Sequence, residues 1–238
     1  GHRSVEQVAK KKRTRSRAEA GKAGLLLSGG TRYLRIGVLS YQGDVSEHMD
    51  MISSTGHEPV PVKTGQALSS VHGLILPGGE STCQGKLLMR FGLDAPIRER
   101  IMQGMPVFGT CTGAILLART IAGSDQPRLG TMDIEISRNA FGAQVDSFET
   151  ELDIKGITDD ERYGRGGFKA LFIRAPLITR TGPDVEVMAA FGGNTVLARQ
   201  SNMLACSFHP EMGEDARVHR YFADMVEEYS RISKGVGI

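Results

Sequence analysis

The chain has 238 residues, of which 40% are hydrophobic and 24% charged, and its formal net charge is +2. This length is enough for one substantial domain with a buried core and too short for two large ones. No apolar run approaches the length that spans a bilayer, and three widely spaced cysteines predict neither a disulfide framework nor a zinc site. We therefore expect a protein of the reducing cytoplasm that holds no metal.

The charge is distributed unevenly along the chain. Residues 1–34 hold nine basic and two acidic residues, a net charge of +7, whereas the remainder holds 20 basic and 25 acidic residues, a net charge of −5. The basic run at 10–17 is compatible with a nucleic-acid patch, but it contains no aromatic residue that would stack on bases. We predict a basic, flexible N-terminal extension over 1–34 and a single domain over 35–238, with no nucleic-acid or membrane partner.

Beyond residue 34 the hydrophobic pattern alternates between the periods of strands and helices. In the first half it predicts strands at 34–39, 58–62, 73–76 and 105–108, and helices at 44–54, 84–91, 95–103 and 114–118. In the second half it predicts strands at 132–137, 148–153, 170–173, 185–191, 195–198 and 204–208, a turn at 192–194 and a last amphipathic helix at 215–232. This order predicts a three-layer α/β fold, in which helices cover both faces of a mixed, mainly parallel sheet that antiparallel strands extend.

One cysteine stands at a predicted strand-to-helix junction. Cys111 is the centre of the pentapeptide 109–113, Gly-Thr-Cys-Thr-Gly, which follows an apolar strand and opens a helix. The two glycines leave room for the strained turn of a nucleophile elbow, which lifts the side chain clear of the sheet edge. The N-terminus of the following helix favours an anion, so the thiolate becomes easier to form. Cys111 is therefore the candidate nucleophile, and Cys83 and Cys206 are expected to be small core residues.

The tripeptide His209-Pro210-Glu211 follows the last predicted strand. If it is extended, His209 and Glu211 point to the same side, and the carboxylate can orient the imidazole. Cys111, His209 and Glu211 would then be the nucleophile, the general base that later acts as an acid, and the group that fixes the tautomer. The remaining histidines, including His48 and His219, have no comparable partner pattern, and the sequence assigns them no role.

Three candidate segments follow predicted strands: the turn Gly78-Gly79, Cys111 and His209. Ligands of open α/β sheets bind at the carboxyl ends of the strands, so these segments are expected to converge at one edge. The backbone N–H groups of Gly79 and Thr112 are the candidate oxyanion hole, because two such donors stabilise a tetrahedral intermediate.

Further motifs accompany the elbow and the His-Pro-Glu tripeptide. They are Leu39-Ser40-Tyr41-Gln42-Gly43-Asp44, Pro77-Gly78-Gly79-Glu80-Ser81-Thr82, Phe108-Gly109-Thr110-Cys111, Arg138-Asn139-Ala140-Phe141-Gly142, Phe172-Ile173-Arg174-Ala175-Pro176 and Phe208-His209-Pro210-Glu211. Together they resemble the glutaminase subunit of the heteromeric pyridoxal phosphate (vitamin B6) synthase, a triad-type (class I) glutamine amidotransferase, from about residue 34 to the last helix. The elbow and His-Pro-Glu are shared by triad amidotransferases in general, whereas the Gly-Gly-Glu-Ser-Thr, Arg-Asn-x-Phe-Gly and Phe-Ile-Arg-Ala-Pro pieces are much narrower.

The resemblance implies a class I amidotransferase-like fold and a glutaminase that hydrolyses L-glutamine to L-glutamate and ammonia through a thioester on Cys111. It implies that the ammonia passes to a separate synthase (lyase) subunit that builds pyridoxal phosphate, and that this chain needs no cofactor. The glutamine contacts that it implies are Gly79, Glu80, Ser81, Arg138, Ile173 and Arg174. The two guanidinium groups suit the α-carboxylate of glutamine.

Three positions depart from the pattern of this family: Tyr41, Cys83 and Thr112 stand where Leu, Thr and Ala are usual. Thr112 still supplies a backbone N–H, so the oxyanion argument is unaffected. Alternatives are a glutaminase that feeds another synthase, such as that of the imidazole glycerol phosphate pathway, a cysteine hydrolase that acts on peptides, and a non-catalytic regulatory subunit of the same fold. The narrow motifs argue against the first, the His-x-Glu placement against the second and the intact triad against the third.

Overall fold

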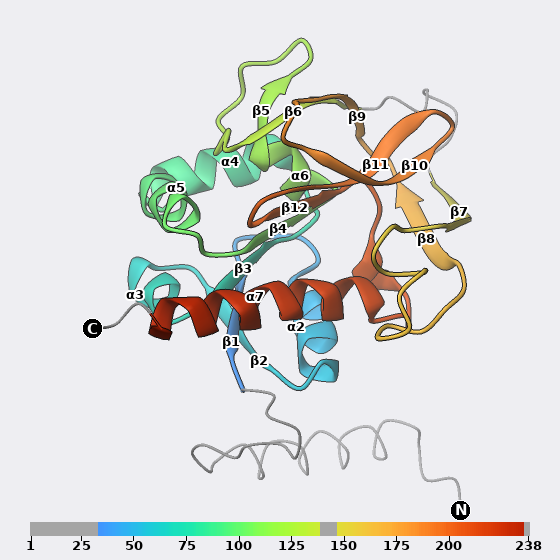
Figure 1. The fold of residues 1–238 in the computed structure, drawn as a ribbon. Helices are drawn as coiled ribbons and strands as arrows, with labels where there is room; N and C mark the ends of the chain where they lie inside the picture. The colour runs from blue at the N-terminus through green and yellow to red at the C-terminus, as the bar shows by residue number, and fades with distance from the viewer. Residues whose placement is uncertain (1–32, 139–146, 236–238) are drawn as a thin grey trace, which may run out of the picture. The chain divides into compact units, whose positions relative to one another are not determined.

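A computed structural model describes residues 33–138 and 147–235, and these residues build one mixed sheet flanked by helices (Figure 1). The main sheet has ten strands in these ranges, in the order β2-β1-β3-β4-β12-β11-β9-β6-β5, with β10 paired to β11. The three-layer α/β fold predicted from the sequence is confirmed.

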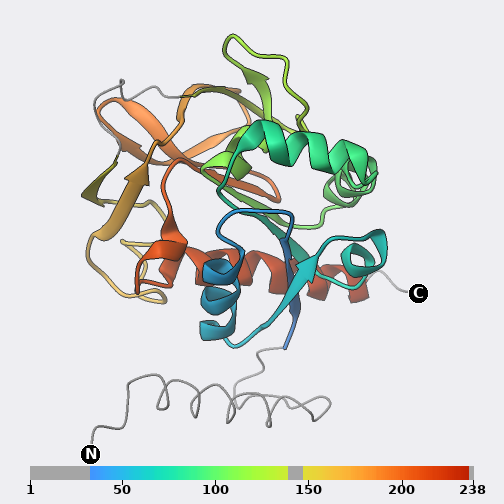
Figure 2. The same cartoon turned by 180° about the vertical axis from the view of Figure 1, so that it is seen from behind.

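The first half of the sheet is parallel. It consists of β2 (Glu58–Val62), β1 (Arg35–Leu39), β3 (Gly73–Leu76), β4 (Val107–Thr110) and β12 (Met203–Cys206). The helices of this half are α2 (Val45–Ser54), α3 (Gly65–Ser69), α4 (Ser81–Arg90), α5 (Asp94–Met102) and α6 (Thr112–Leu117). Because these strands run in the same direction, their carboxyl ends lie at one edge of the sheet. Figure 2 shows the same strands and helices from behind.

The second half is mostly antiparallel. Strands β11 (Asn194–Gln200), β9 (Leu177–Thr181) and β6 (Met132–Ser137) continue the sheet from β12, and β5 (Ala118–Ile121) pairs parallel to β6. The predicted turn closes a hairpin between β10 (Glu186–Phe191) and β11. Strands β7 (Ser147–Leu152) and β8 (Phe168–Ile173) form a separate two-stranded sheet, so the prediction that they extend the main sheet is wrong.

Hydrophobic side chains pack against both faces of the main sheet. One cluster joins the strands to α2 and to the long helix α7 (Arg217–Gly235), and includes Ile52, Phe108 and Phe222. The other cluster joins the strands to α4, α5 and α6, and includes Leu88 and Ile97. Burial of these apolar surfaces supplies most of the stabilising free energy, and it holds the strand ends in fixed positions.

Four elements were not predicted from the hydrophobic pattern: α3, β5, β9 and the short 3-10 turn η1 (Pro210–Met212). Helix α3 has only five residues and begins at the side-chain cap of Thr64, whose hydroxyl accepts the N–H of Ala67. The predicted helix at 114–118 ends one residue earlier, because Ala118 begins β5. No helix in the described ranges is long and apolar enough to cross a membrane.

Candidate active site

The elbow at Cys111 has the strained backbone that its sequence predicts. Cys111 follows β4, precedes α6 and has φ 50° and ψ −106°, a conformation that a non-glycine residue rarely adopts. A Cβ at Gly109 would lie 2.4 Å from the carbonyl oxygen of Gly113, and a Cβ at Gly113 would lie 1.9 Å from that of Leu76. Side chains at either glycine would clash with backbone, so the tight turn requires both.

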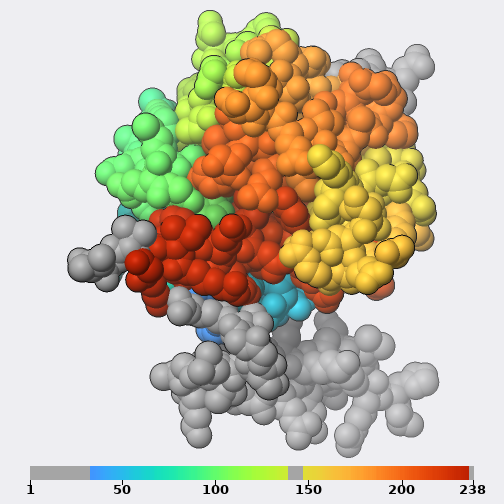
Figure 3. All heavy atoms as spheres, in the orientation of Figure 1, coloured from blue at the N-terminus to red at the C-terminus, as the bar shows by residue number. Residues whose placement is uncertain are grey.

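The carboxyl ends of four parallel strands meet around this cysteine. Asp44 follows β1, Gly79 follows β3, Cys111 follows β4 and His209 follows β12, and all four line one pocket of about 500 Å³. Every predicted site residue except the buried Glu211 lines this pocket. A larger hollow of about 630 Å³ lies between α7 and the 156–163 segment, which border each other in Figure 3, and holds none of the predicted residues.

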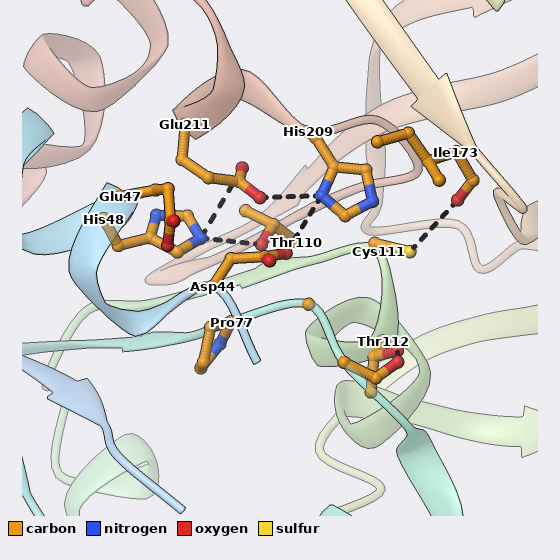
Figure 4. Close-up of polar contacts among 12 residues, drawn as sticks. Asp44, Glu47, His48, Pro77, Thr110, Cys111, Thr112, Ile173, His209 and Glu211 are labelled. Atoms are coloured by element: carbon orange, nitrogen blue, oxygen red, sulfur yellow. Dashed lines mark hydrogen bonds and ion pairs between the residues drawn. The ribbon is translucent and has the colours of Figure 1, made fainter. Parts of the chain in front are cut away.

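His209 and Glu211 lie side by side, but not for the predicted reason. The tripeptide is not extended: His209 precedes a short 3-10 turn, η1 (Pro210–Met212). This turn brings the carboxylate of Glu211 next to Nδ1 of the imidazole. The distance from His209 Nδ1 to Glu211 Oε1 is 2.7 Å, and the other ring nitrogen of His209 faces the sulfur of Cys111 (Figure 4). Cys111, His209 and Glu211 therefore form a connected row.

The surroundings of His209 favour its charged form. Burial lowers the pKa of His209, but hydrogen bonds to Cys111 and Glu211 outweigh burial and raise it to about 10. A second carboxylate, that of Asp44, lies 3.3 Å from the same Nδ1. Burial raises the pKa of Glu211, against the lowering effect of its bond to His209. This arrangement stabilises an imidazolium next to the sulfur of Cys111.

Among the described residues, Asp44, His209 and Glu211 also offer ligand atoms that lie within 4.8 Å of one another, close enough to share a metal ion. The imidazole nitrogen nearest the two carboxylates, Nδ1 of His209, already makes the hydrogen bond to Glu211. We interpret the two carboxylates as stabilising charge around the imidazole.

We expect Cys111→Ala to lower the pKa of His209. The bond to Cys111 is one cause of the raised value, so the variant imidazole should lose its proton well below pH 10. A raised pKa in the folded chain means that this charge stabilises the fold fully below the ordinary value of 6.5, and that the contribution is lost as the pH rises through about 10. NMR titration of the ¹⁵N-labelled imidazole measures both values; an unchanged titration would show that the thiol does not influence His209.

The two residues of the candidate oxyanion hole are in contact through a bond that the sequence did not predict. The hydroxyl of Thr112 donates to the carbonyl oxygen of Gly79 at 2.5 Å. This bond holds the peptide between Gly79 and Glu80 against Thr112, next to the N–H of Gly79. The unusual threonine therefore contributes its side chain to the pocket wall as well as a backbone N–H.

The predicted glutamine contacts Glu80, Ser81 and Arg138 lie at the start of α4 and just after β6, and each makes polar contacts with its neighbours. Both carboxylate oxygens of Glu80 accept backbone N–H groups, those of Thr82 and Cys83, and so cap α4. Burial opposes the change, but these bonds lower the pKa of Glu80. The amide oxygen of Gln126, which the sequence analysis missed, joins the buried hydroxyl of Ser81 at 3.3 Å to Nη1 of Arg138 at 2.8 Å.

The predicted pair Ile173 and Arg174 lies opposite, at the end of β8. The carbonyl oxygen of Ile173 is 4.0 Å from the Cys111 sulfur, and Arg174 has φ 44°, a second strained backbone at the pocket. The segment 139–142 of the Arg-Asn-x-Phe-Gly motif lies outside the described residues.

The other two departures have local partners. Tyr41 stacks on Phe91 with ring centroids 5.2 Å apart and donates to the carbonyl of Lys63. Cys83 is exposed, so its prediction as a core residue is wrong, and only its backbone N–H contributes to the cap of α4. Cys206 is buried, as predicted.

The sequence analysis assigned no role to four residues that contact His209 or lie near Glu211 on the side away from Cys111: Asp44, His48, Thr110 and His219. Asp44 precedes His48 by four residues, the spacing of one helix face, which is a signal that connects them. Nothing in the linear sequence connects His219, 171 residues further on, to either.

Comparisons with known proteins agree with this geometry. Residues 38–228 match the SNO glutamine amidotransferase family. The chain is 49% identical to the pyridoxal 5'-phosphate synthase subunit PdxT of Carboxydothermus hydrogenoformans, over 81% of this chain and 98% of that protein, and 48% identical to PdxT of Geobacillus thermodenitrificans, over 84% and 99%.

Solved structures give the same result. The chain resembles a crystal structure of a glutamine amidotransferase with a TM-score of 0.75 and 45% identity, which covers 80% of this chain and 98% of that one. A GMP synthase component from Thermoplasma acidophilum, 18% identical with a TM-score of 0.63 over 86% of this chain and 99% of that one, shares the fold. The chain belongs to the SNO glutamine amidotransferase family.

Proposed function

We propose that the chain hydrolyses L-glutamine to L-glutamate and ammonia, with Cys111 as nucleophile, His209 as acid and base, and Glu211 as the group that orients His209. The observation that carries this proposal is the row of Cys111, His209 and Glu211 at the wall of a pocket in a glutamine amidotransferase, in which the imidazole faces the sulfur and is hydrogen-bonded to the carboxylate. A nucleophile, a base in contact with it and a carboxylate behind the base are the parts that acyl transfer needs.

The chemistry takes two steps. The Cys111 thiolate attacks the side-chain amide carbon of glutamine, and the C–N bond breaks as His209 gives its proton to the leaving nitrogen, which departs as ammonia. Water then attacks the glutamyl thioester while His209 takes a proton from it; the C–S bond breaks and glutamate leaves. The hydrogen bond from His209 to Glu211 keeps the other ring nitrogen directed at the sulfur in both steps.

Backbone and arginine groups support the reacting atoms. We assign the oxyanion hole to the N–H groups of Gly79 and Thr112, since one such donor contributes roughly 3–4 kcal/mol to transition-state stabilisation. Arg138 and Arg174 line the same pocket and are assigned to the α-carboxylate of glutamine. Gly79, Glu80, Ser81 and Ile173 on the wall are assigned to the rest of the glutamine molecule.

We further propose that the ammonia passes to a separate synthase subunit that makes pyridoxal phosphate in the cytoplasm. The support is the identity of 48–49% to proteins named as PdxT subunits of pyridoxal 5'-phosphate synthase, over 98–99% of their length. The family match spans residues 38–228, which supports our assignment of the activity to 35–238 and of 1–34 to an extension outside that domain.

We expect weak glutaminase activity from the purified chain alone and much stronger activity with the synthase subunit. Released ammonia is wasted unless an acceptor is present, so a partner that completes the site prevents waste. The measurement is glutamate release with and without the synthase. Equal rates with and without the synthase would contradict activation by the partner subunit.

Labelling of Cys111 by a glutamine-like diazo ketone, read as a mass shift, separates an active glutaminase from a non-catalytic subunit, which would remain unlabelled.

A further inference from the structure

Two buried histidines lie behind the triad, on the side of Glu211 that faces away from His209. His48 on α2 and His219 on α7 are both shielded from solvent, and His48 Nδ1 lies 2.9 Å from His219 Nε2. The other ring nitrogen of His48, Nε2, lies 3.0 Å from the hydroxyl oxygen of Thr110 and 3.6 Å from Oε2 of Glu211 (Figure 4). Four elements, α2, α7, β4 and η1, therefore meet at one imidazole.

Both rings are neutral at ordinary pH. Burial, and then the proximity of His219 and His209, lower the pKa of His48 far below its usual range, and burial lowers the pKa of His219 to about 3. A neutral imidazole carries one proton, so each ring has one donor and one acceptor nitrogen. The arrangement of the neighbours decides which nitrogen is which.

Two tautomer assignments satisfy the contact between the two rings. If His48 Nδ1 carried the proton, the lone pair of its Nε2 would face the Glu211 carboxylate, and the remaining proton of His219 would be on Nδ1, which has no partner among the described residues. In the reverse assignment, His219 Nε2–H donates to His48 Nδ1, and His48 Nε2–H points toward Thr110 and Glu211. The reverse assignment avoids both a buried unpaired donor and a lone pair facing an anion, so it is favoured.

We propose that His48 is a positioning residue of the triad: its Nε2–H faces Oε2 of Glu211 and keeps Oε1 on His209. The proposal rests on the proposed role of Cys111, His209 and Glu211 in glutamine hydrolysis. Glu211 is buried, and Oε2 has no hydrogen bond within the described ranges. The N–H of His48 hydrogen-bonds the Thr110 hydroxyl at 3.0 Å and also faces Oε2 at 3.6 Å, an electrostatic contact with the carboxylate. His219 fixes the tautomer of His48, and Thr110 holds the plane of its ring.

The expected consequence is a change in when Glu211 ionises. A donor that faces a buried carboxylate favours the charged form, so removal of His48 should raise the pKa of Glu211 and move the acid limb of the activity profile to higher pH. The other ionisable groups around His48 and Glu211 are His219 from α7, His209 before η1, Asp44 at the start of α2 and Cys206 of β12, whose thiol donates to the carbonyl of Phe208. None of them offers a donor to Oε2 of Glu211 that would replace His48.

The test compares His48→Asn with His48→Gln in the full chain with its synthase. The glutamine amide reaches the position of Nε2, whereas the asparagine amide reaches only that of Nδ1. We expect His48→Asn to lower kcat about 10- to 100-fold with KM changed less than about twofold, and His48→Gln to recover most of kcat. The acid limb should move to higher pH only in His48→Asn.

A second readout does not need glutamine hydrolysis. The rate at which iodoacetamide alkylates Cys111, measured against pH by peptide mass in a Cys83→Ser background, follows the Cys111–His209 pair directly. We expect His48→Asn to shift this profile and His48→Gln to leave it near that of the parent. If the parent chain shows this alkylation profile but hydrolyses no glutamine with any synthase, the proposed function is contradicted. The alkylation profiles of the two His48 variants then still test the role of His48.

The matched control is His57→Gln. His57 is also buried, accepts the N–H of Leu34 and lies 3.4 Å from Glu227, so its loss reports the general cost of removing a buried histidine. The proposal would be overturned if the pH profiles of His48→Asn and His48→Gln were equal. It would also be overturned if the loss of activity only followed the loss of melting temperature, as expected for His57→Gln.

Discussion

Cys111→Ala should lower the rate of glutamine hydrolysis by at least about 10⁴-fold and leave binding to the synthase subunit intact. In the proposed mechanism the thiol forms the bond that splits the reaction into two steps, and loss of a nucleophile from a comparable triad costs about 10⁶-fold. The side chain lies inside the pocket wall, 7% exposed, so its truncation leaves the outer surface unchanged. Glutamate release and co-elution with the synthase measure the two effects.

The control for this experiment is Cys83→Ser, because Cys83 is exposed and does not line the pocket of Cys111. Because Cys83 is not part of the proposed triad, this variant should keep the activity of the parent. A fully active Cys111→Ala variant would remove Cys111 from the mechanism.

The same position also allows a measurement of the strain at the elbow. Alanine at 111 keeps the strained φ of 50°, whereas glycine adopts that conformation freely. Both substitutions remove the thiol, so the difference between them isolates the backbone. We expect the free energy of unfolding of Cys111→Gly to exceed that of Cys111→Ala by at most about 1 kcal/mol. The greater conformational entropy of the unfolded glycine chain offsets part of this gain.

The sequence predicted the parts of this site that depend on local chemistry. The elbow at Cys111 is visible because its steric demands select glycine at two fixed positions, and the alternation of strands and helices is visible because each has its own hydrophobic period. The carboxyl ends of parallel strands lie at the same edge of a sheet, so motifs that each follow such a strand are predicted to meet at that edge.

Contacts that arise from packing were not visible in the sequence. His48 and His219 meet because α2 and α7 cover the same face of the sheet, and the tautomer that links them depends on Glu211 from a third element. The turn at Glu211 escaped for a different reason: a histidine and a glutamate two residues apart share a side in an extended strand and also in the tight turn observed. The contact was predicted correctly from an incorrect backbone.

Two carboxylates approach the same nitrogen of His209, and this allows a test of which one orients it. Glu211 Oε1 lies 2.7 Å from Nδ1 and is buried, whereas Asp44 Oδ2 lies 3.3 Å away with a side chain 23% exposed. A shorter bond in a drier place is stronger, since solvent screens the exposed charge. Glu211 should therefore fix the tautomer, and Asp44 should add only a modest electrostatic contribution.

We expect Glu211→Gln to lower kcat by about 10²- to 10⁴-fold, with KM for glutamine changed little, because a neutral amide neither stabilises the imidazolium nor selects its tautomer. Asp44→Asn, the matched change at the second carboxylate, should cost less than about tenfold. The measurements are kcat and KM with the synthase present, and an NMR titration of His209, whose pKa should fall more in Glu211→Gln. If Asp44→Asn proves the more damaging of the two, Asp44 would be the orienting acid and the triad assignment would have to change.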